Sequence, residues 1–326
     1  MSSNKTYEKE LAFQSDRRRA TIEFIKSVSD LYYDNSIELV LFRNQLTDRN
    51  VSQILSLHEY AGEFVQKPIS IFDSVAIAKA IKFLKLPPSK IDIGKLTYEY
   101  QLEKKKFSNT LAFAQNKLKG AYKKDDIYPK DEVLYGFGRI GRLVARELMS
   151  RTGQGSQLRL RAIVTRGEIN DTILEKRASL LRCDSVHGDF PGTVSIDSKK
   201  QALIINGTTV NVISSNKPED IDYAKYGISN ALVIDNTGAF RDQERLGRHL
   251  TAKGVANVLL TAPGIGVPNI VHGVNQFDYD PDNVNIFSAA SCTTNAITPV
   301  LKAVEDSYGV KSGHIETIHA YTNDQN

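Results

Sequence analysis

The chain has 326 residues, of which 41% are hydrophobic and 25% are charged, as is usual for a soluble globular protein of two or three domains. No apolar run approaches the roughly 20 residues that a membrane helix needs. The polar start, residues 1–10, also lacks the apolar core of a secretory signal. Only two cysteines occur, Cys183 and Cys292, so no disulfide framework is implied and a reducing, cytoplasmic location is expected.

The net charge of +4 is unevenly distributed along the chain. Residues 1–130 hold 22 Lys and Arg against 16 Asp and Glu, whereas the remainder has a small acidic excess. The basic residues gather at 104–106 and 117–124. Such runs are usually solvated helix faces, so a phosphate-rich partner such as a nucleic acid is the weaker interpretation.

Residues 1–129 are expected to form a mostly helical module. Apolar residues recur there at helical spacing, Thr47-Asp48 is a candidate N-cap, and Pro87-Pro88 ends one of the periodic segments. No glycine loop or metal-ligand spacing occurs in this part of the sequence. We expect helices over 10–33, 50–64, 74–86, 91–102 and 110–122, with a short strand over 37–42.

A strand, a glycine-rich turn and a helix are expected next. Residues 132–135 are apolar, Gly136-Phe137-Gly138-Arg139-Ile140-Gly141 follows directly, and a helix over 142–150 leads to a second strand over 158–165. In that context G-x-G-x-x-G predicts a turn that binds the pyrophosphate of a dinucleotide at the helix N-terminus. Further strands are expected over 203–205 and 210–213, joined by a hairpin at Asn206-Gly207, and over 231–234 and 258–260. This pattern predicts an α/β fold with a Rossmann-type domain.

Cys292 lies in the polar run Ser288–Asn295, just before a helix expected over 296–308. Backbone N–H groups and the dipole at a helix N-terminus favour the thiolate, which is the nucleophilic form of cysteine. His319, on a strand expected over 314–321, is a candidate base for that nucleophile. A buried structural cysteine is the competing interpretation, but so polar a run makes a poor core segment.

Residues 288–295 and 318–325 resemble the active-site signature of phosphorylating glyceraldehyde-3-phosphate dehydrogenases, and the similarity runs from about Asp131 to the last residue. The resemblance implies oxidation of glyceraldehyde 3-phosphate, with phosphate and NAD(P)+, to 1,3-bisphosphoglycerate. Cys292 would form a thiohemiacetal and then a thioester, with His319 as the base. It also implies homotetramers. The residues that would bind the phosphate groups of this phosphorylated aldehyde and of the attacking phosphate are Ser291, Thr293 and Thr322.

The resemblance also implies a set of cofactor contacts and one departure that bears on NAD versus NADP. Thr165 stands where most NAD-dependent members carry an Asp that binds the adenosine ribose. Without that carboxylate, and with Arg166 next to it, we expect NADP to be accepted, alone or alongside NAD. Glu168 leaves an NAD-like contact open, and Tyr135 replaces a usual Asn. The implied cofactor residues are Gly136, Phe137, Gly138, Arg139, Ile140, Gly141, Thr165, Arg166, Thr237, Gly238 and Thr261.

Two further departures shape the expected organisation. Residues 1–129 precede the usual start and resemble an extended bacterial subgroup, while the catalytic domain stops early, inside a segment similar to the family's S-shaped loop. We therefore expect a helical extension at 1–129, an NAD(P)-binding domain at 130–290 and an incomplete catalytic domain at 291–326. On that basis the chain is a C-terminally truncated fragment that is itself inactive. The alternatives are an erythrose-4-phosphate dehydrogenase and a non-catalytic binding role.

Overall fold

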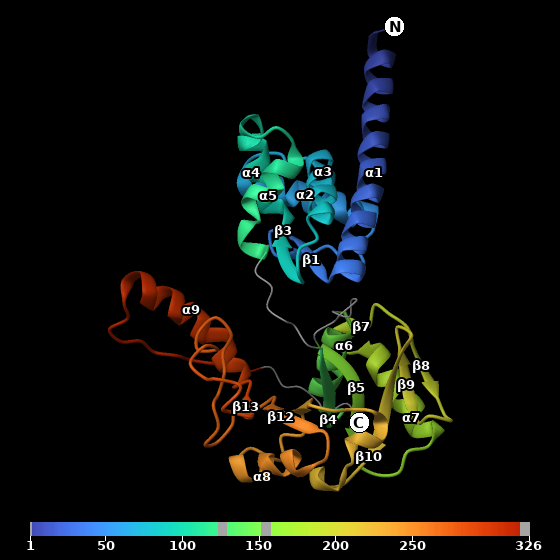
Figure 1. The fold of residues 1–326 in the computed structure, drawn as a ribbon, viewed down its shortest axis with the longest axis vertical. Coiled ribbons are helices and arrows are strands. Elements are labelled where there is room, and N and C mark those ends of the chain that lie inside the picture. The colour runs from blue at the N-terminus through green and yellow to red at the C-terminus, as the bar shows by residue number, and fades with distance from the viewer. Residues whose placement is uncertain (1, 123–128, 151–157, 320–326) are drawn as a thin grey trace. The chain divides into compact units, whose positions relative to one another are not determined.

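The computed structural model describes residues 2–122, 129–150 and 158–319 (Figure 1). The chain divides into two compact units. We call residues 2–122 the N-terminal unit, and residues 129–150 with 158–319 the C-terminal unit. Within the described ranges, no helix combines the length and the apolar character that crossing a membrane requires.

The N-terminal unit packs helices against a small sheet (Figure 1). The sheet has the order β2-β1-β3, with β1 parallel to β3 and antiparallel to β2. Its core combines large apolar residues of α1, α2, α3 and α5 with those of the sheet. The elements are α1 (Ser2–Asn35), β1 (Ile37–Leu41), β2 (Asn44–Gln45), α2 (Val51–Val65), α3 (Ile71–Leu84), β3 (Ser89–Asp92), α4 (Ile93–Glu103), η1 (Lys104–Lys106), α5 (Thr110–Lys117) and η2 (Lys119–Tyr122).

The expected helical character of this unit is confirmed, with two local corrections. The helix expected over 91–102 begins only at Ile93, because residues 89–92 pair with β1 as a strand. Asp92 then caps α4 by accepting a hydrogen bond from the backbone N–H of Lys95. The N-cap of α2 is Asn50 and not Thr47 or Asp48, since its side chain and that of Gln53 form a reciprocal capping box.

A chain of buried polar side chains crosses the core of the N-terminal unit. The His58 ring lies 2.8 Å from the Ile54 carbonyl oxygen through Nδ1 and 3.1 Å from Ser74 Oγ through Nε2. Ser74 Oγ is in turn 3.1 Å from Thr97 Oγ1. A carbonyl can only accept, so Nδ1 carries a proton, whereas Ser74 Oγ can either donate to Nε2 or accept from it.

The C-terminal unit is built on an eight-stranded sheet of order β13-β12-β11-β4-β5-β10-β9-β8. Its strands are β4 (Lys130–Tyr135), β5 (Leu158–Thr165), β8 (Val194–Asp197), β9 (Ala202–Ile205), β10 (Thr208–Ser214), β11 (Ala231–Asp235), β12 (Val255–Leu260) and β13 (Ile286–Ser288); β6 (Cys183–Asp184) and β7 (Gly188–Asp189) pair separately. The helices are α6 (Arg139–Ser150), α7 (Asp171–Arg182), η3 (Pro218–Asp220), η4 (Tyr223–Tyr226), α8 (Gln243–Gly247), η5 (Arg248–Thr251) and α9 (Cys292–Tyr308).

Six neighbouring strands of this sheet, from β13 to β10, run parallel. The chain enters at β4, builds outward through β5 to β10, and then returns to add β11, β12 and β13 on the other side of β4. Successive residues of β4 serve opposite faces: Leu134 packs with α6 and α7, and Val133 packs with Tyr223 of η4. This doubly wound arrangement, preceded by a helical unit, confirms the expected α/β fold with a Rossmann-type domain.

Local features of the C-terminal unit agree with the sequence except near its end. Asn206 and Gly207 both adopt positive φ between the antiparallel strands β9 and β10, which confirms the hairpin. Helix α9 begins at Cys292 and not at 296. The strand expected over 314–321 is wrong for its described part, residues 314–319, which pair with no other strand. Helix α9 buries none of its residues, so this segment has no packed surface on which to form a strand.

Glu132 is a buried acid in the central strand β4. Its side chain is 1% exposed, and Oε2 has no hydrogen-bond partner in the described parts of the chain. Burial therefore disfavours the carboxylate and raises the pKa of Glu132 to about 7.

We predict that replacing Glu132 with Gln stabilises the C-terminal unit at pH 8 and has little effect near pH 5. The raised pKa means that the folded state holds a proton that the unfolded state releases, so wild-type stability falls as pH rises from about 4.5 to 7. The gain at pH 8 is expected to reach up to about 3 kcal/mol. Urea unfolding at both pH values measures it, with exposed Glu244→Gln as a control. A stability change that is the same at both pH values would contradict the ionisation account.

The opposite pH dependence is predicted for the N-terminal unit. Burial lowers the pKa of His58, with a partly opposing contribution from the hydrogen bond to Ile54. The unfolded state therefore takes up a proton first, and stability is lost as pH falls below about 6.5. Hydrogen-exchange protection of α2 and α3 should decrease between pH 7.5 and 5.5 after correction for intrinsic rates. In His58→Gln, protection should be lower overall but should lose this pH dependence.

Candidate functional site

A cavity of about 520 Å³ lies at the carboxyl ends of the parallel strands. Its walls come from the segments that follow β4, β5, β10 and β11, with one residue from α7. The strand order reverses between β4 and β11, and ligands of doubly wound sheets bind at such a point. The lining residues are Tyr135, Gly136, Phe137, Gly138, Val164, Thr165, Arg166, Arg177, Ser215, Asn216, Asn236, Thr237, Ala239 and Phe240.

The glycines of the turn after β4 have distinct roles. Gly136 has a φ of +93°, and a Cβ there would lie 2.8 Å from Thr237 Cγ2. A Cβ on Gly141 would overlap the carbonyl oxygen of Gly136, so this glycine lets α6 start against the turn. Gly138 differs, because a Cβ on it would meet no protein atom within 4 Å. The open space beside Gly138 fits a ligand that approaches the backbone at the N-terminus of α6.

The side of the cavity at β5 is basic. Strand β5 ends at Thr165, which is 6% exposed and whose Oγ1 has no hydrogen-bond partner among the described residues. Arg166 follows it, Arg177 reaches the cavity from α7, and Ser215 with Asn216 follows β10. None of the residues that line this cavity is acidic.

The opposite side of the cavity is organised by the buried carboxylate of Asp235, at the end of β11. Asp235 Oδ1 accepts hydrogen bonds from the backbone N–H and the hydroxyl of Thr237, and Oδ2 lies 3.0 Å from His249 Nε2. Thr261 Oγ1 donates to the Asp235 carbonyl oxygen at 3.1 Å, which joins the turns after β11 and β12. Tyr135 packs edge-on against His249, and burial, then Asp235, raises the pKa of Tyr135 to about 12.

Cys292 is exposed and is the first residue of α9. The helix is capped by Ser291, whose Oγ accepts a hydrogen bond of 2.9 Å from the Thr294 backbone N–H. The preceding segment is tied to the sheet, because Ser288 Oγ donates to the Ala262 carbonyl oxygen and the Ala289 N–H donates to the Leu260 carbonyl oxygen. Cys292 therefore follows the carboxyl end of β13, at the edge of the sheet that also bears the cavity.

His319 follows α9 in the chain and lies beside the first turn of that helix. Its Nε2 is 3.2 Å from Thr293 Oγ1, so the chain after α9 returns to the residue beside Cys292. In the described part of the chain, no hydrogen bond joins Cys292 to His319, and Cys292 is not among the residues that line the cavity. The structure thus brings a thiol and an imidazole to one helix terminus, separate from the cavity lining.

The residues expected to bind the cofactor fall into two groups. Some line the cavity, and others lie in the same turns without lining it. Arg139, for example, has Nε 3.7 Å from Asp184 Oδ2, and Ile140 is half exposed. Those in the lining are Gly136, Phe137, Gly138, Thr165, Arg166 and Thr237; those outside it are Arg139, Ile140, Gly141, Gly238 and Thr261. Thr322, expected at the substrate phosphate, lies outside the described residues.

Sequence reasoning did not assign the other lining residues to the cofactor, and the polar ones among them include Ser215, Asn216 and Arg177. Ser215 and Asn216 follow the expected strand over 210–213, and that position at a strand end is a signal that could have identified them. Arg177 has no comparable signal, because it lies inside α7 in a charged helical sequence. The pairing of His249 with Asp235 joins two elements and is equally invisible in local sequence.

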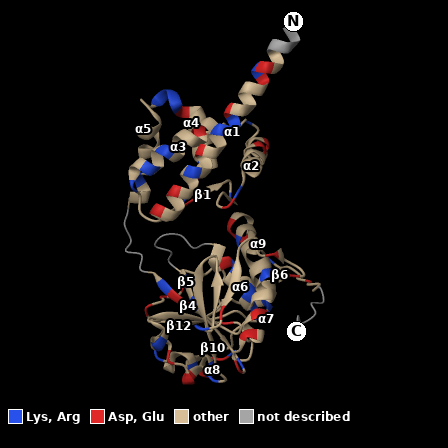
Figure 2. Cartoon of the chain, turned by 90° about the vertical axis from the view of Figure 1, so that its right-hand side faces the viewer, with Lys and Arg blue, Asp and Glu red and all other residues tan. Residues whose placement is uncertain are grey.

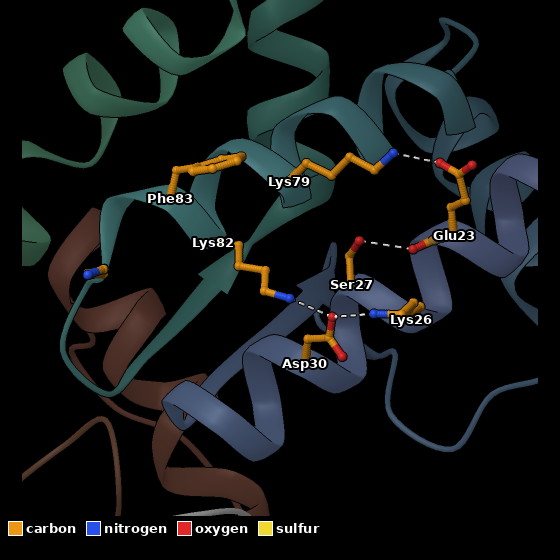
Figure 3. Close-up of a pocket in the computed structure, with 8 residues that line it drawn as sticks. Glu23, Lys26, Ser27, Asp30, Lys79, Lys82 and Phe83 are labelled. Atoms are coloured by element: carbon orange, nitrogen blue, oxygen red, sulfur yellow. Dashed lines mark hydrogen bonds and ion pairs between the residues drawn. The ribbon is translucent and has the colours of Figure 1, made fainter.

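The N-terminal unit has a groove of its own, between α1 and α3 (Figure 3). Three of its four lysines pair with acids: Lys79 Nζ lies 2.6 Å from Glu23, and Lys82 and Lys26 lie 2.6 and 3.0 Å from Asp30. The hydrogen bond from Lys82, then that from Lys26, lowers the pKa of Asp30. In Figure 2 basic and acidic residues are interspersed along the helices of this unit, and the groove itself contains Glu23 and Asp30 beside its lysines.

Comparisons with known proteins agree with this arrangement. Residues 132–243 match the family model described as glyceraldehyde 3-phosphate dehydrogenase, NAD binding domain, and residues 291–326 match that of the C-terminal domain. The first match contains the glycine turn, and the second begins one residue before Cys292. The match to an NAD-binding domain supports a nicotinamide dinucleotide as the ligand of the cavity.

Three similar proteins extend the comparison beyond the family models. A glyceraldehyde-3-phosphate dehydrogenase-like protein of Pseudomonas aeruginosa is 47% identical over 308 residues, which are 93% of this chain and 66% of that protein. Glyceraldehyde-3-phosphate dehydrogenases of Zymomonas mobilis and Ajellomyces capsulatus are 38% and 36% identical over 58% and 57% of the chain, or 53% and 51% of their own lengths. The chain thus spans about two thirds of the first relative and about half of the others. It belongs to the glyceraldehyde-3-phosphate dehydrogenase family.

Proposed function

We propose that this chain carries the nucleophile and the cofactor site of a phosphorylating dehydrogenase that oxidises glyceraldehyde 3-phosphate to 1,3-bisphosphoglycerate. The observation that carries the proposal is the position of Cys292, exposed at the N-terminus of α9 and anchored to the sheet edge that bears the dinucleotide-sized cavity. An exposed thiol at a helix N-terminus is suited to act as a thiolate nucleophile.

In the proposed reaction the Cys292 thiolate attacks the aldehyde carbon and forms a thiohemiacetal. His319 serves as the base, and its place beside Thr293 supports this role. The backbone N–H of Cys292, at the open end of α9, and the His319 ring are suited to stabilise the developing oxyanion. Loss of hydride from the same carbon gives a thioester on Cys292. Inorganic phosphate then attacks the thioester carbon and displaces the Cys292 thiolate, and the product leaves as an acyl phosphate.

Two hydroxyls beside Cys292 are proposed to bind phosphate groups. Ser291 Oγ and Thr294 Oγ1 lie 2.7 Å apart, and Thr293 is positioned by its contact with His319. Ser291 and Thr293 are assigned to the attacking phosphate, and Thr322 to the phosphate of the substrate, by family resemblance. In the same way we propose that residues 291–326 belong to a catalytic domain distinct from the dinucleotide-binding domain at 130–290, and that the protein is a cytoplasmic homotetramer.

The cofactor, when bound, supplies the acceptor for the hydride. The chain's own contribution is the backbone around Gly138, the N-terminus of α6 for the pyrophosphate, and the Thr237 turn held by Asp235. The fit is supported by the open space beside Gly138 and by the unpaired hydroxyl of Thr165 in the cavity wall. Both NAD and NADP are compatible with these groups.

In a protein that joins this chain to a complete catalytic domain, we predict that one equivalent of reduced cofactor forms in the absence of phosphate, that Cys292 becomes acylated, and that phosphate permits turnover. Cys292→Ser should abolish both, because a serine hydroxyl is a far weaker nucleophile at neutral pH. His319→Asn should slow the reaction by about 10²-fold or more. Cofactor absorbance and intact-protein mass spectrometry measure the two events.

Cys183→Ser is the matched control, since Cys183 is also exposed but lies on β6. It should leave the reaction unchanged. If Cys292→Ser keeps more than about a tenth of the rate, Cys292 is not the nucleophile. A higher rate with erythrose 4-phosphate than with glyceraldehyde 3-phosphate would instead assign the protein to the sister activity.

A second prediction separates two glycines of the turn. Gly138→Ala should weaken dinucleotide binding without changing stability, because its Cβ would occupy open space beside the cavity. Gly141→Ala should lower stability as well, because its Cβ would overlap the carbonyl oxygen of Gly136. Calorimetric titration and thermal unfolding check both variants. Unchanged binding in Gly138→Ala would place the pyrophosphate elsewhere.

A further inference from the structure

Two arginines of the cavity differ from the other arginines around α7. Arg182 is fully engaged, with Glu175 Oε1 at 2.6 Å and the Val194 carbonyl oxygen at 2.8 Å. Arg146 donates to the carbonyl oxygens of Leu181 and Gly188. Arg166 and Arg177, by contrast, form no ion pair or hydrogen bond within the described ranges, although both line the cavity. The cavity thus carries two cations that no described residue neutralises.

Arg177 is partly buried, and one of its N–H groups lacks an acceptor. Its Nε is inaccessible to solvent and has no partner in the described structure. A buried guanidinium N–H that lacks an acceptor loses hydration without compensation, so such groups are normally paired. No acidic residue lines the cavity, and Glu168, the acid next along the chain from Arg166, is not part of the wall. An anion bound in the cavity would supply the partner that the described residues do not provide.

The neighbouring groups locate this anion at the adenosine end of a dinucleotide. Thr165 ends β5, the strand after the one that carries the glycine turn, and in such folds that position faces the ribose 2′-hydroxyl. Its Oγ1 is buried, unpaired and in the cavity wall. Ser215 is joined to it, because the Ser215 backbone N–H donates to the Thr165 carbonyl oxygen at 3.0 Å.

We propose that Arg177, together with Arg166, forms a binding site for the 2′-phosphate of NADP, and that the protein binds NADP in preference to NAD. The inference rests on the proposed function only in taking the cavity as the dinucleotide site. A phosphate monoester carries nearly two negative charges at neutral pH, and guanidinium groups bind it through short, charge-assisted hydrogen bonds. The Thr165 hydroxyl, which has no partner among the described residues, supplies a neutral donor at the same place. Arg177 is thus a specificity-determining residue contributed by a helix.

The test is calorimetric titration of the full chain with NADP+, NAD+, 2′,5′-ADP and 5′-AMP. We expect NADP+ to bind at least about tenfold more tightly than NAD+, and 2′,5′-ADP more tightly than 5′-AMP. Arg177→Gln should weaken NADP+ and 2′,5′-ADP by about tenfold or more and change NAD+ by less than about twofold. Arg177→Lys should recover part of the loss, since it keeps the charge but not the planar fork. Lys176→Gln, an exposed neighbour on α7, removes the same charge outside the cavity and should change neither.

The titrations, together with the Cys292 assays, distinguish four alternative outcomes. Equal weakening of NADP+ and NAD+ by Arg177→Gln would mean a structural role and would overturn the proposal. Tighter binding of NAD+ than NADP+ to the wild-type protein would overturn it while leaving the dinucleotide site intact. If neither dinucleotide binds, the proposed cofactor site fails as well. If NADP+ binds in an Arg177-dependent way but no Cys292 chemistry occurs, the proposed function fails and this inference stands.

Discussion

The parallel pairing of β4 with β11 is the contact on which the cavity depends. It aligns Tyr135 with Asp235, so that the glycine turn after one strand lies directly beside the Thr237 turn after the other. The Asn236 backbone N–H donates to the Tyr135 carbonyl oxygen, and only a residue without a Cβ fits against Thr237 at position 136. The strand order reverses at this pair, so no connection crosses over the gap and it stays open to a ligand. A shift of one residue in the register of β4 and β11 would separate the glycine turn from the Thr237 turn.

A buried carboxylate holds the second of these turns in place. Asp235 accepts from Thr237 and contacts His249, while its backbone carbonyl oxygen accepts from Thr261. Removing an ionised group from water is unfavourable unless several donors replace the hydration, and this site supplies them. The His249 Nδ1 atom is left without a partner among the described residues, so the network is complete only on the side that faces the cavity. The polar groups around Asp235 therefore hold the Thr237 turn in position, in addition to satisfying a buried carboxylate in the core.

The sequence predicts what is local and fails where the structure depends on distant pairing. The glycine turn, the hairpin at Asn206-Gly207 and the strand ends bearing Thr165 and Thr237 follow from short patterns with direct steric meaning. Strand β3 was missed because only its pairing with β1 stops residues 89–92 from joining the next helix. Arg177 was missed because a charged residue in a helix has no pattern that reveals which cavity it reaches. Helix α9 shows the converse case: its apolar period correctly predicted a helix, yet Val300 is 57% exposed in the described structure.

The position of Cys292 does not depend on the packing of α9, because none of the residues of that helix is fully buried. It depends on the four residues before the cysteine. Ser288 is fixed by hydrogen bonds to Ala262 and Asn269, and Ala290 has a φ of +59°, a conformation that costs a non-glycine residue on the order of 1 kcal/mol. Such a residue persists only where its surroundings determine it, and here the Asn295 side chain bonds the carbonyl oxygens on both sides of Ala290. The strained turn redirects the chain from β13 into α9 and leaves the thiol at an exposed helix N-terminus. The sheet therefore places the proposed nucleophile, and the helix contributes its N-terminal N–H groups and dipole.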